Sequence, residues 1–424
     1  METEKKNAGK WESVLDRMII LLILGGVILM PVQLRYPILF KKIGYYGYVN
    51  FPAVLAVLLS FLKCRRWQKA EWICFGAWLL ALIPMILSNR ETETKRAVTA
   101  LLMNLAPLFL VLVHMDEREK KRTLRLFLWI FNGFILFLLA LGVEEKLNNM
   151  ALLRLIRDWI DANGYKNIDL TRYVDDSRFA SVWAHPLTHT FLFNAFFAVN
   201  GIWVKENRSR IPVILIFLAA LAGNLLSASK MGIIVCFALL IVFTWKQKKW
   251  LLLTVPVFVA LYFTGAFDKI IERFMKGDLT TGRLEDLKAY FSSGINPLRV
   301  FTGYGTNSVL NKSHPLYVIN DAFEAPLMMY AYDYGIVTSL VLVGGVYAYS
   351  TCRLLREKRW IPWICYTLLF AEVNTFNAYA SRHQEVCFLM CLVTMILLNM
   401  KIREEPNAGK DEPAGAATDG PAAS

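Results

Sequence analysis

The sequence predicts an all-α integral membrane protein with about 12 transmembrane helices and a large extracytoplasmic loop between the ninth and tenth helices. Hydrophobic residues make up 56% of the 424 residues, against the roughly 45–50% that is usual in soluble domains. Apolar runs recur along the chain at the length of about 20 residues that a transmembrane helix needs. Lys and Arg gather in alternate short loops, as the positive-inside rule requires.

Twelve apolar runs are interpreted as the spans of one polytopic domain, residues 18–400. A basic segment, residues 1–17, precedes them, and the tail, residues 401–424, follows. The tail is rich in Pro, Gly, Ala and Asp, which predicts disorder. The expected spans are 18–34, 47–62, 72–88, 97–114, 125–143, 186–204, 211–227, 231–245, 250–267, 326–350, 360–376 and 385–400.

The net charge of +13 is explained by topology. Basic residues are dense in 63–71, 115–125, 246–249 and 352–359, which are all connections on one side of the predicted bundle. Loops of this kind stay in the cytoplasm, so both termini are expected there. The charge therefore predicts orientation and contact with anionic headgroups, and nucleic acid is not an expected partner.

Two long loops are predicted outside the membrane, residues 144–185 and 268–325. The first opens with an amphipathic pattern over 151–161, which is typical of a helix that lies in the membrane interface. The second is a polar stretch from Asp268 to Glu324 between two apolar runs. Loops of this length inside a compact domain usually carry function.

The first candidate cluster enters a span at its outer end. Arg172 and Arg178 can clamp phosphate through the planar donors of their guanidinium groups. The alternative is interface anchoring or pairing with nearby aspartates. His185 and His189 are four residues apart around Pro186; a buried, hydrogen-bonded role is favoured over metal binding, because no HExxH pattern accompanies them.

Two further candidates for anion binding are basic side chains in outside segments. Lys230 lies in a very short turn, Ser227–Gly232, where it either reaches the headgroups or points into the bundle towards an anion. Arg283 lies in the second long loop, where it either binds diphosphate or pairs with Glu285 or Asp286.

Acidic and imidazole groups near the tenth span are candidates for the general base. Asp321 and Glu324 are three residues apart, so a helix that begins there presents both on one face. Asp321 can instead cap that helix. His314 precedes them. Glu372, in or at the edge of the eleventh span, is a candidate because ionisable groups inside membranes are costly.

The order and placement of these segments resemble the O-antigen ligase and O-antigen polymerase superfamily. Arg178-Phe-Ala-Ser-Val-Trp-Ala-His185-Pro186 is similar to the family's Arg, aromatic, His/Asn-Pro segment. Leu225-Leu-Ser-Ala-Ser-Lys-Met-Gly232 resembles its Thr/Ser-x-Ser-Arg-x-Gly turn, with Lys in place of Arg. Gly282-Arg283, Asn296-Pro297 and Gly303-Tyr304-Gly305 are similar to its Arg…Pro…Gly-x-Gly loop, and Gly335 fits its closing Gly.

The resemblance implies a metal-independent glycosyltransferase in the bacterial cytoplasmic membrane, without a cofactor. It would transfer or polymerise undecaprenyl-diphosphate-linked glycan at the outer face, onto a glycan or lipid-linked acceptor. A flippase and a chain-length regulator are partners that the resemblance allows. The residues expected in catalysis are Arg178, Arg283, Asp321 and Glu324, and those expected to bind diphosphate or glycan are Arg172, His185, His189, Lys230, His314 and Arg382.

One departure leaves the type of transferase open. Ligases of this family typically carry His-Asn eleven residues ahead of the closing Gly, and Glu324 holds that position here. Either Glu324 or Asp321 is the base of a ligase, or the chain is a polymerase that relies on paired arginines, which is the favoured reading. The rival class is a lipid-linked oligosaccharide flippase or another polysaccharide transporter.

Overall fold

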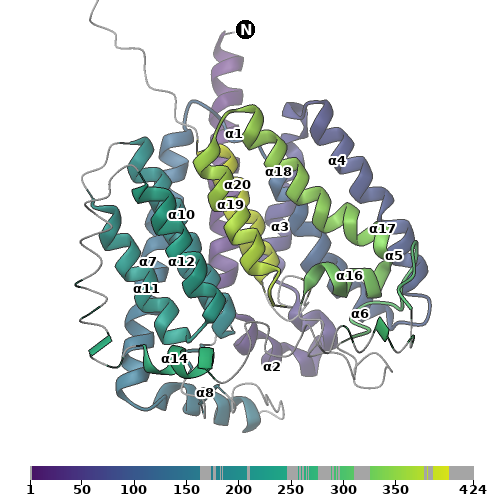
Figure 1. Cartoon of the computed structure of the whole chain (residues 1–424). Helices are drawn as coiled ribbons and strands as arrows, with labels where there is room; N and C mark the ends of the chain where they lie inside the picture. Colours follow the sequence, from purple (N-terminus) through teal and green to yellow (C-terminus); the bar gives the residue numbers. More distant parts are fainter. Residues whose placement is uncertain are drawn as a thin grey trace, which may run out of the picture.

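The fold is built from helices over the described part of the chain (Figure 1). The computed structural model describes residues 2–162, 173–174, 178–181, 183, 185–207, 211–245, 256, 259, 262–263, 265, 267–275, 288, 291–292, 294, 297–309, 325–376, 380 and 385–400.

The helices fall into an N-terminal, a middle and a C-terminal set. The N-terminal set is α1 (Glu2–Leu29), α2 (Val32–Ile43), α3 (Phe51–Ser60), α4 (Lys69–Leu80), α5 (Leu82–Ser88) and α6 (Thr94–Ala100). The middle set is α7 (Lys120–Leu147), α8 (Ala151–Ala162), α10 (Pro186–Glu206), α11 (Val213–Ser227), α12 (Lys230–Thr244) and α14 (Asp268–Met275). The C-terminal set is α16 (Pro326–Tyr334), α17 (Ile336–Ser339), α18 (Gly345–Arg356), α19 (Trp360–Val373) and α20 (Val386–Asn399).

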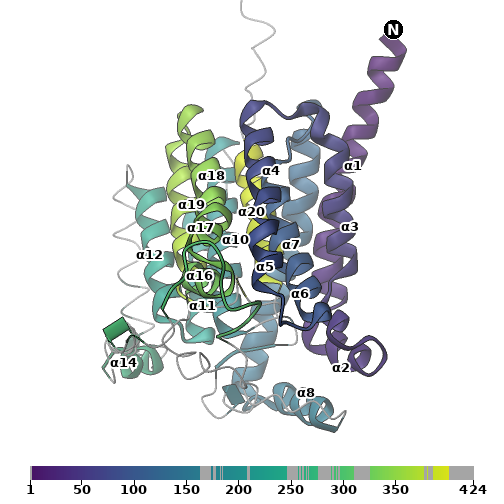
Figure 2. The ribbon, with the colours of Figure 1, turned by 90° about the vertical axis from the view of Figure 1, so that its right-hand side faces the viewer.

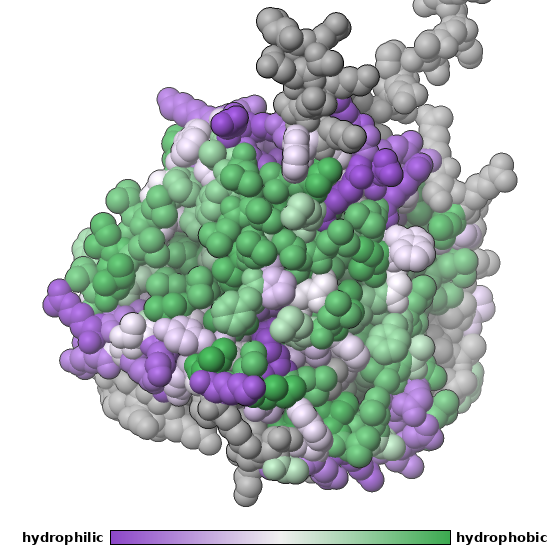
Figure 3. Space-filling view, turned by 180° about the vertical axis from the view of Figure 1, so that it is seen from behind, coloured by the Kyte–Doolittle hydropathy of each residue, from purple (hydrophilic) through white to green (hydrophobic). Residues whose placement is uncertain are grey.

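Several of these helices are long and apolar enough to span a membrane, which supports a membrane protein. Five continuous stretches in the described residues meet that condition, and a sixth does if the bent pair α1 and α2 counts as one span. Figure 3 shows hydrophobic side chains over the middle of one face and hydrophilic ones towards its two ends. Helices α11, α12, α19 and α20 are apolar but shorter. The long stretches are Lys69–Ser88, Thr94–Leu112, Lys120–Leu147, Pro186–Glu206 and Ile336–Arg356.

The first expected span, 18–34, is bent within its length. The chain bends by 73° between Trp11–Leu29 and Val32–Leu39. Pro31 lies at the bend, and proline cannot donate the backbone hydrogen bond that would continue α1 into α2. Helix α2 therefore turns away from the axis of α1 (Figure 2).

The tenth expected span, 326–350, is interrupted, because the helix breaks at Gly335 and the apolar stretch of membrane-spanning length begins at Ile336. The amides of Ile336 and Val337 donate to the loop carbonyls of Arg299 and Val300, each at 3.0 Å, instead of continuing the ladder of α16. Gly335 has a φ of +96°, and a Cβ there would lie 2.7 Å from the carbonyl carbon of Phe301. Only glycine fits this backbone conformation and this close approach.

The fifth expected span, 125–143, is longer at both ends. Helix α7 runs from Lys120 to Leu147, so the first long loop begins after Leu147 and not at residue 144. Lys and Glu are good helix formers, so the charged ends continue the helix beyond its apolar centre. The amphipathic pattern over 151–161 is confirmed as helix α8, which buries Leu153 and Ile160.

Helix α10 lies at the centre of the packing. It contacts α7, α11, α12, α19 and α20, and most of its side chains are buried. Its phenylalanines supply much of this core; Phe197, for example, packs on Phe217 of α11 and Phe243 of α12. The middle set of helices therefore surrounds α10 on one side, while α4, α5 and α16–α18 lie on the other (Figures 1 and 2).

The bundle has two polar ends. We call one the basic face: it holds the beginning of α1, Lys63, Arg66, the beginning of α7 and the end of α18. Buried ion pairs occur there, among them Lys63 with Asp16. We call the other the loop face: α2, α8, α14 and α16 lie there in both ribbon views.

The break at Gly335 gives a testable prediction. Gly335→Ala forces an L side chain into the positive-φ region and against the loop backbone, which costs about 1–3 kcal/mol. Gly344→Ala is the matched control in the same span, because a Cβ there meets nothing within 4 Å. Thermal unfolding in detergent should show a lower midpoint for Gly335→Ala alone; equal midpoints would contradict the proposed role of the break.

Candidate functional site

Two segments that are far apart in the sequence, residues 178–181 and the turn at 226–230, lie against each other on the loop face. The amide of Phe179 donates to the carbonyl of Leu226 at 3.0 Å. Arg178 donates from Nε to the Ser227 carbonyl at 3.4 Å, and its guanidinium lies 5.8 Å from the centre of the Tyr173 ring. Arg178 is 9% exposed, so this cation is held at the turn and not extended into solvent. We call the turn at 226–230, together with the Arg178 side chain held against it, the Arg178 turn.

The turn itself presents Lys230 at the beginning of α12. Helix α11 ends at Ser227, and Ala228 then adopts a left-handed conformation with φ of 50°. The Ser229 hydroxyl accepts from the Gly232 amide at 3.1 Å and caps α12. The Lys230 ammonium lies 5.3 Å from the centre of the Phe274 ring in α14, so the start of the second long loop also lies against this turn.

The two candidate histidines have different partners. His185 caps α10, since its Nδ1 accepts from the Leu187 amide at 3.1 Å. His189 is fully buried, with its Nε2 2.9 Å from the Ser181 hydroxyl and its ring 4.6 Å from that of Phe179. The buried, hydrogen-bonded position expected for these histidines therefore describes His189. Ser181 was missed by the sequence reasoning, and no spacing pattern marks it.

A buried polar network lies directly under the turn. The Asn194 side-chain amide donates to both carboxylate oxygens of Glu372, at 2.9 and 3.0 Å, and to the Gly232 carbonyl at 3.0 Å. The Asn224 side chain donates to the Asn194 oxygen at 3.0 Å. These residues join α10, α11, α12 and α19. Asn194 and Asn224 were missed, although a polar amide in an expected span is a signal that could have found them.

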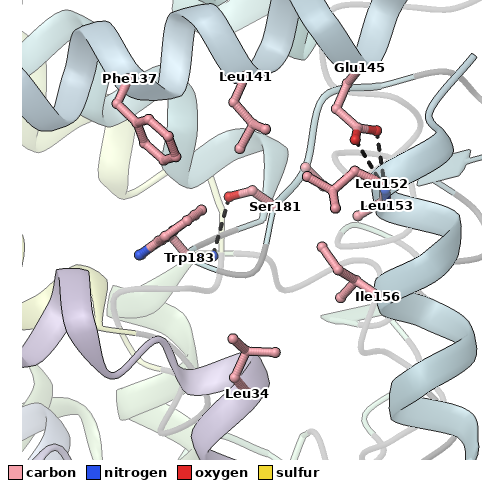
Figure 4. A pocket seen from close by; sticks show the side chains of 10 residues that line it. Leu34, Phe137, Leu141, Glu145, Leu152, Leu153, Ile156, Ser181 and Trp183 are labelled. Atoms are coloured by element: carbon pink, nitrogen blue, oxygen red, sulfur yellow. Dashed lines mark hydrogen bonds between the residues drawn. The ribbon is translucent and has the colours of Figure 1, made fainter. Parts of the chain in front are cut away.

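An apolar cavity of about 250 Å³ opens beside the Arg178 segment (Figure 4). Helices α2, α7 and α8 line it together with Ala180, Ser181 and Trp183. Ser181 is at its wall, and its hydroxyl accepts from the Trp183 amide at 3.2 Å. Glu145 is also at its wall, but both carboxylate oxygens accept from the Leu153 amide at 3.2 Å. The cavity is thus suited to a hydrocarbon chain.

A second cluster on the loop face joins residues 297–309 to α16. The amides of Tyr304 and Gly305 donate to the carbonyls of Tyr332 and Asp333, at 2.8 and 3.0 Å. A Cβ at Gly303 would lie 2.2 Å from the Tyr332 carbonyl oxygen, so this close approach requires glycine. Gly303-Tyr304-Gly305 and the stretch that ends at Gly335 are therefore in direct contact.

The Asp333 side chain and the end of α5 hold the same loop. The carboxylate of Asp333 accepts from the amides of Asn307 and Ser308, at 2.7 and 2.9 Å. The Ser88 hydroxyl accepts from the Gly303 amide at 2.8 Å. Six predicted site residues lie outside the described part of the chain: Arg172, Arg283, His314, Asp321, Glu324 and Arg382.

The chain matches no family model, curated protein or solved structure in the comparisons made with each. The function is therefore inferred from the geometry of the loop face. It combines a buried guanidinium and an ammonium at one turn with an apolar cavity beside them. Such an arrangement can bind an anion that is attached to a hydrocarbon chain.

The polar network under the turn gives the second prediction. Asn194→Ala removes the donors to Glu372 and leaves a buried carboxyl without them, which costs about 1–3 kcal/mol. Asn200→Ala is the matched control on α10, because within the described part of the chain the Asn200 side chain bonds to the neutral Asn132 side chain and the Phe196 carbonyl. Chemical unfolding in micelles should rank Asn194→Ala as the less stable variant. A reversed ranking would contradict the central place given to Asn194.

Proposed function

We propose that the chain is a membrane glycosyltransferase that uses an undecaprenyl-diphosphate-linked glycan at the outer face of the bacterial cytoplasmic membrane. The observation that carries the proposal is the pair of cations, Arg178 and Lys230, at one turn beside an apolar cavity. A diphosphate needs fixed positive charge, and a polyprenyl chain needs an apolar surface. The resemblance of the same segments to the O-antigen ligase and polymerase superfamily supports this choice.

The proposed reaction is a displacement at the anomeric carbon of the donor sugar. The acceptor hydroxyl forms the new C–O bond, the bond from that carbon to the diphosphate oxygen breaks, and undecaprenyl diphosphate leaves. Arg178, Lys230 and Arg283 stabilise the negative charge that develops on the leaving group. Asp321 or Glu324 takes the proton of the acceptor hydroxyl as general base.

The proposed orientation places the basic face in the cytoplasm. Lys63, Arg66, Lys120 and Arg353 lie at this face, and the positive-inside rule favours such residues in cytoplasmic connections. With about 12 spans, the loop face and both long loops then lie outside. This orientation puts the Arg178 turn where lipid-linked glycans are assembled after their export.

The flippase or transporter reading is kept as the second candidate because of Glu372. This residue is 1% exposed and lies among four helices. Ionisable groups in such positions commonly line transport pathways. A transporter would move the lipid-linked glycan without changing its covalent structure, so the two candidates differ in their products.

The third prediction tests by mutation the role proposed for the three basic residues. Arg178→Ala, Lys230→Gln and Arg283→Ala should each lower glycan transfer by about 10²–10³-fold, as expected when one group that stabilises a developing charge is lost. The readout is the amount of longer glycan made from purified lipid-linked donor, resolved by gel electrophoresis.

Arg157→Ala is the control for that assay. Arg157 lies on α8 at the loop face, pairs with Asp158 at 2.7 Å, and is not among the residues that line the apolar cavity. Arg178→Lys is added because it keeps the charge while removing the bond from Nε to Ser227. Normal product from Arg178→Ala and Arg283→Ala, with both proteins inserted in the membrane, would end the transferase proposal.

A further inference from the structure

A polar pocket of about 420 Å³ opens on the basic face, far along the bundle from the Arg178 turn. It lies between the beginnings of α4 and α7 and the ends of α18 and α20. Its polar lining comes from four helix ends, and nothing in the proposed transfer reaction uses it. The side chains that matter here are Arg66, Gln68, His114, Lys120, Arg353 and Asn399.

Arg353 is fixed at the wall of this pocket by a hydrogen-bonded chain. Its Nη2 lies 3.2 Å from His114 Nδ1, and His114 Nε2 lies 3.1 Å from the Glu71 carboxylate. Because Arg353 can only donate, His114 Nδ1 accepts and its Nε2 carries the hydrogen that Glu71 accepts. Tyr349 also donates to Glu71, at 2.7 Å. The guanidinium is therefore held in place before any ligand arrives.

Two basic groups of the pocket, Lys120 and Arg353, are more buried than the acidic groups that pair with them, Glu117 and Glu357, which also line the pocket. The Lys120 side chain is 8% exposed and its partner Glu117 is 70% exposed, with 2.6 Å between Nζ and Oε1. The Arg353 side chain is 12% exposed and Glu357 is 31% exposed, at 3.6 Å. Arg66 differs from them: its side chain is 32% exposed, and it pairs with Asp116, which is 6% exposed, at 3.1 Å, and with Glu12. Ion pairs with acids as exposed as Glu117 and Glu357 contribute little to stability, so an entering anion can replace these two.

Two features favour phosphate over other anions. Lys120 is the first residue of the 28-residue helix α7, and the beginning of a long helix carries partial positive charge. Arg353 adds a planar set of donors that matches phosphate oxygens. The apolar part of the lining comes from Met115 and Leu398, so the pocket is not purely ionic.

We propose that this pocket binds the phosphate of an anionic phospholipid headgroup from the leaflet at the basic face. Basic pockets between transmembrane helices on the cytoplasmic side bind such headgroups. The choice of leaflet depends on the orientation proposed above, but the binding does not depend on glycosyl transfer. The bound lipid would join the ends of α7 and α18, which belong to opposite sides of the bundle.

The test measures lipid binding to the full-length protein in detergent by native mass spectrometry. The protein is titrated with phosphatidylglycerol and, separately, with phosphatidylcholine. We expect phosphatidylglycerol to bind more tightly, and the double variant Lys120→Gln/Arg353→Gln to weaken its binding by roughly tenfold or more, since each basic residue near the headgroups contributes about a factor of five.

The double variant Arg122→Gln/Arg125→Gln is the matched control, because it removes two exposed positive charges from the same helix. An equal loss in this control, or equal binding of both lipids by the wild type, overturns the proposal. Displacement of phosphatidylglycerol by inorganic phosphate at equal concentration also overturns it, in favour of a site for free phosphate. If Lys120→Gln/Arg353→Gln fails to fold, the single variant Lys120→Gln decides, with an expected loss of about fivefold.

Discussion

Four backbone hydrogen bonds at Gly335 set the architecture of the loop face. The carbonyls of Tyr332 and Asp333 accept from Tyr304 and Gly305, while the amides of Ile336 and Val337 donate to Arg299 and Val300. In a continuous helix, the two carbonyls would instead accept from the two amides of Ile336 and Val337. Buried backbone groups must be satisfied, so the loop supplies the partners that the break removes. The loop therefore takes the place of two hydrogen bonds of a helical ladder, those from Ile336 to Tyr332 and from Val337 to Asp333, and its closing part is held against α16 and α5.

The other end of the long loop is held by the Arg178 turn, and that turn depends on the network around Asn194. In an apolar bundle, a polar side chain that loses its partner has no water to replace it. Asn194 fixes the positions of Glu372, Asn224 and the Gly232 carbonyl. The position of Lys230 follows from these contacts, as does the surface on which Ile270 of α14 packs. The proposed site is thus supported by polar contacts within the membrane-spanning part.

Much of the fold could be predicted from the sequence, because long apolar runs such as 125–143 can satisfy their backbone within a membrane only as helices. The bend after α1 and the break at Gly335 do not follow from hydropathy, which measures composition and not backbone direction. The structure brings together segments that the sequence had marked separately. Arg178 contacts Ser227, and Gly303-Tyr304-Gly305 contacts α16. Ser181 has no such mark, while Asn194 and Asn224 are marked only as polar amides within expected spans, because their partners lie on other helices. The roles of Arg283, Asp321 and Glu324 stay predictions.

The central claim is that the protein changes the covalent structure of a lipid-linked glycan. The most direct measurement uses proteoliposomes that contain only this protein and an undecaprenyl-diphosphate-linked oligosaccharide. Mass spectrometry of the extracted lipids then distinguishes the two candidates. The proposed transferase predicts longer glycan together with released undecaprenyl diphosphate. Unchanged donor that has moved between the leaflets would contradict the account and identify a transporter.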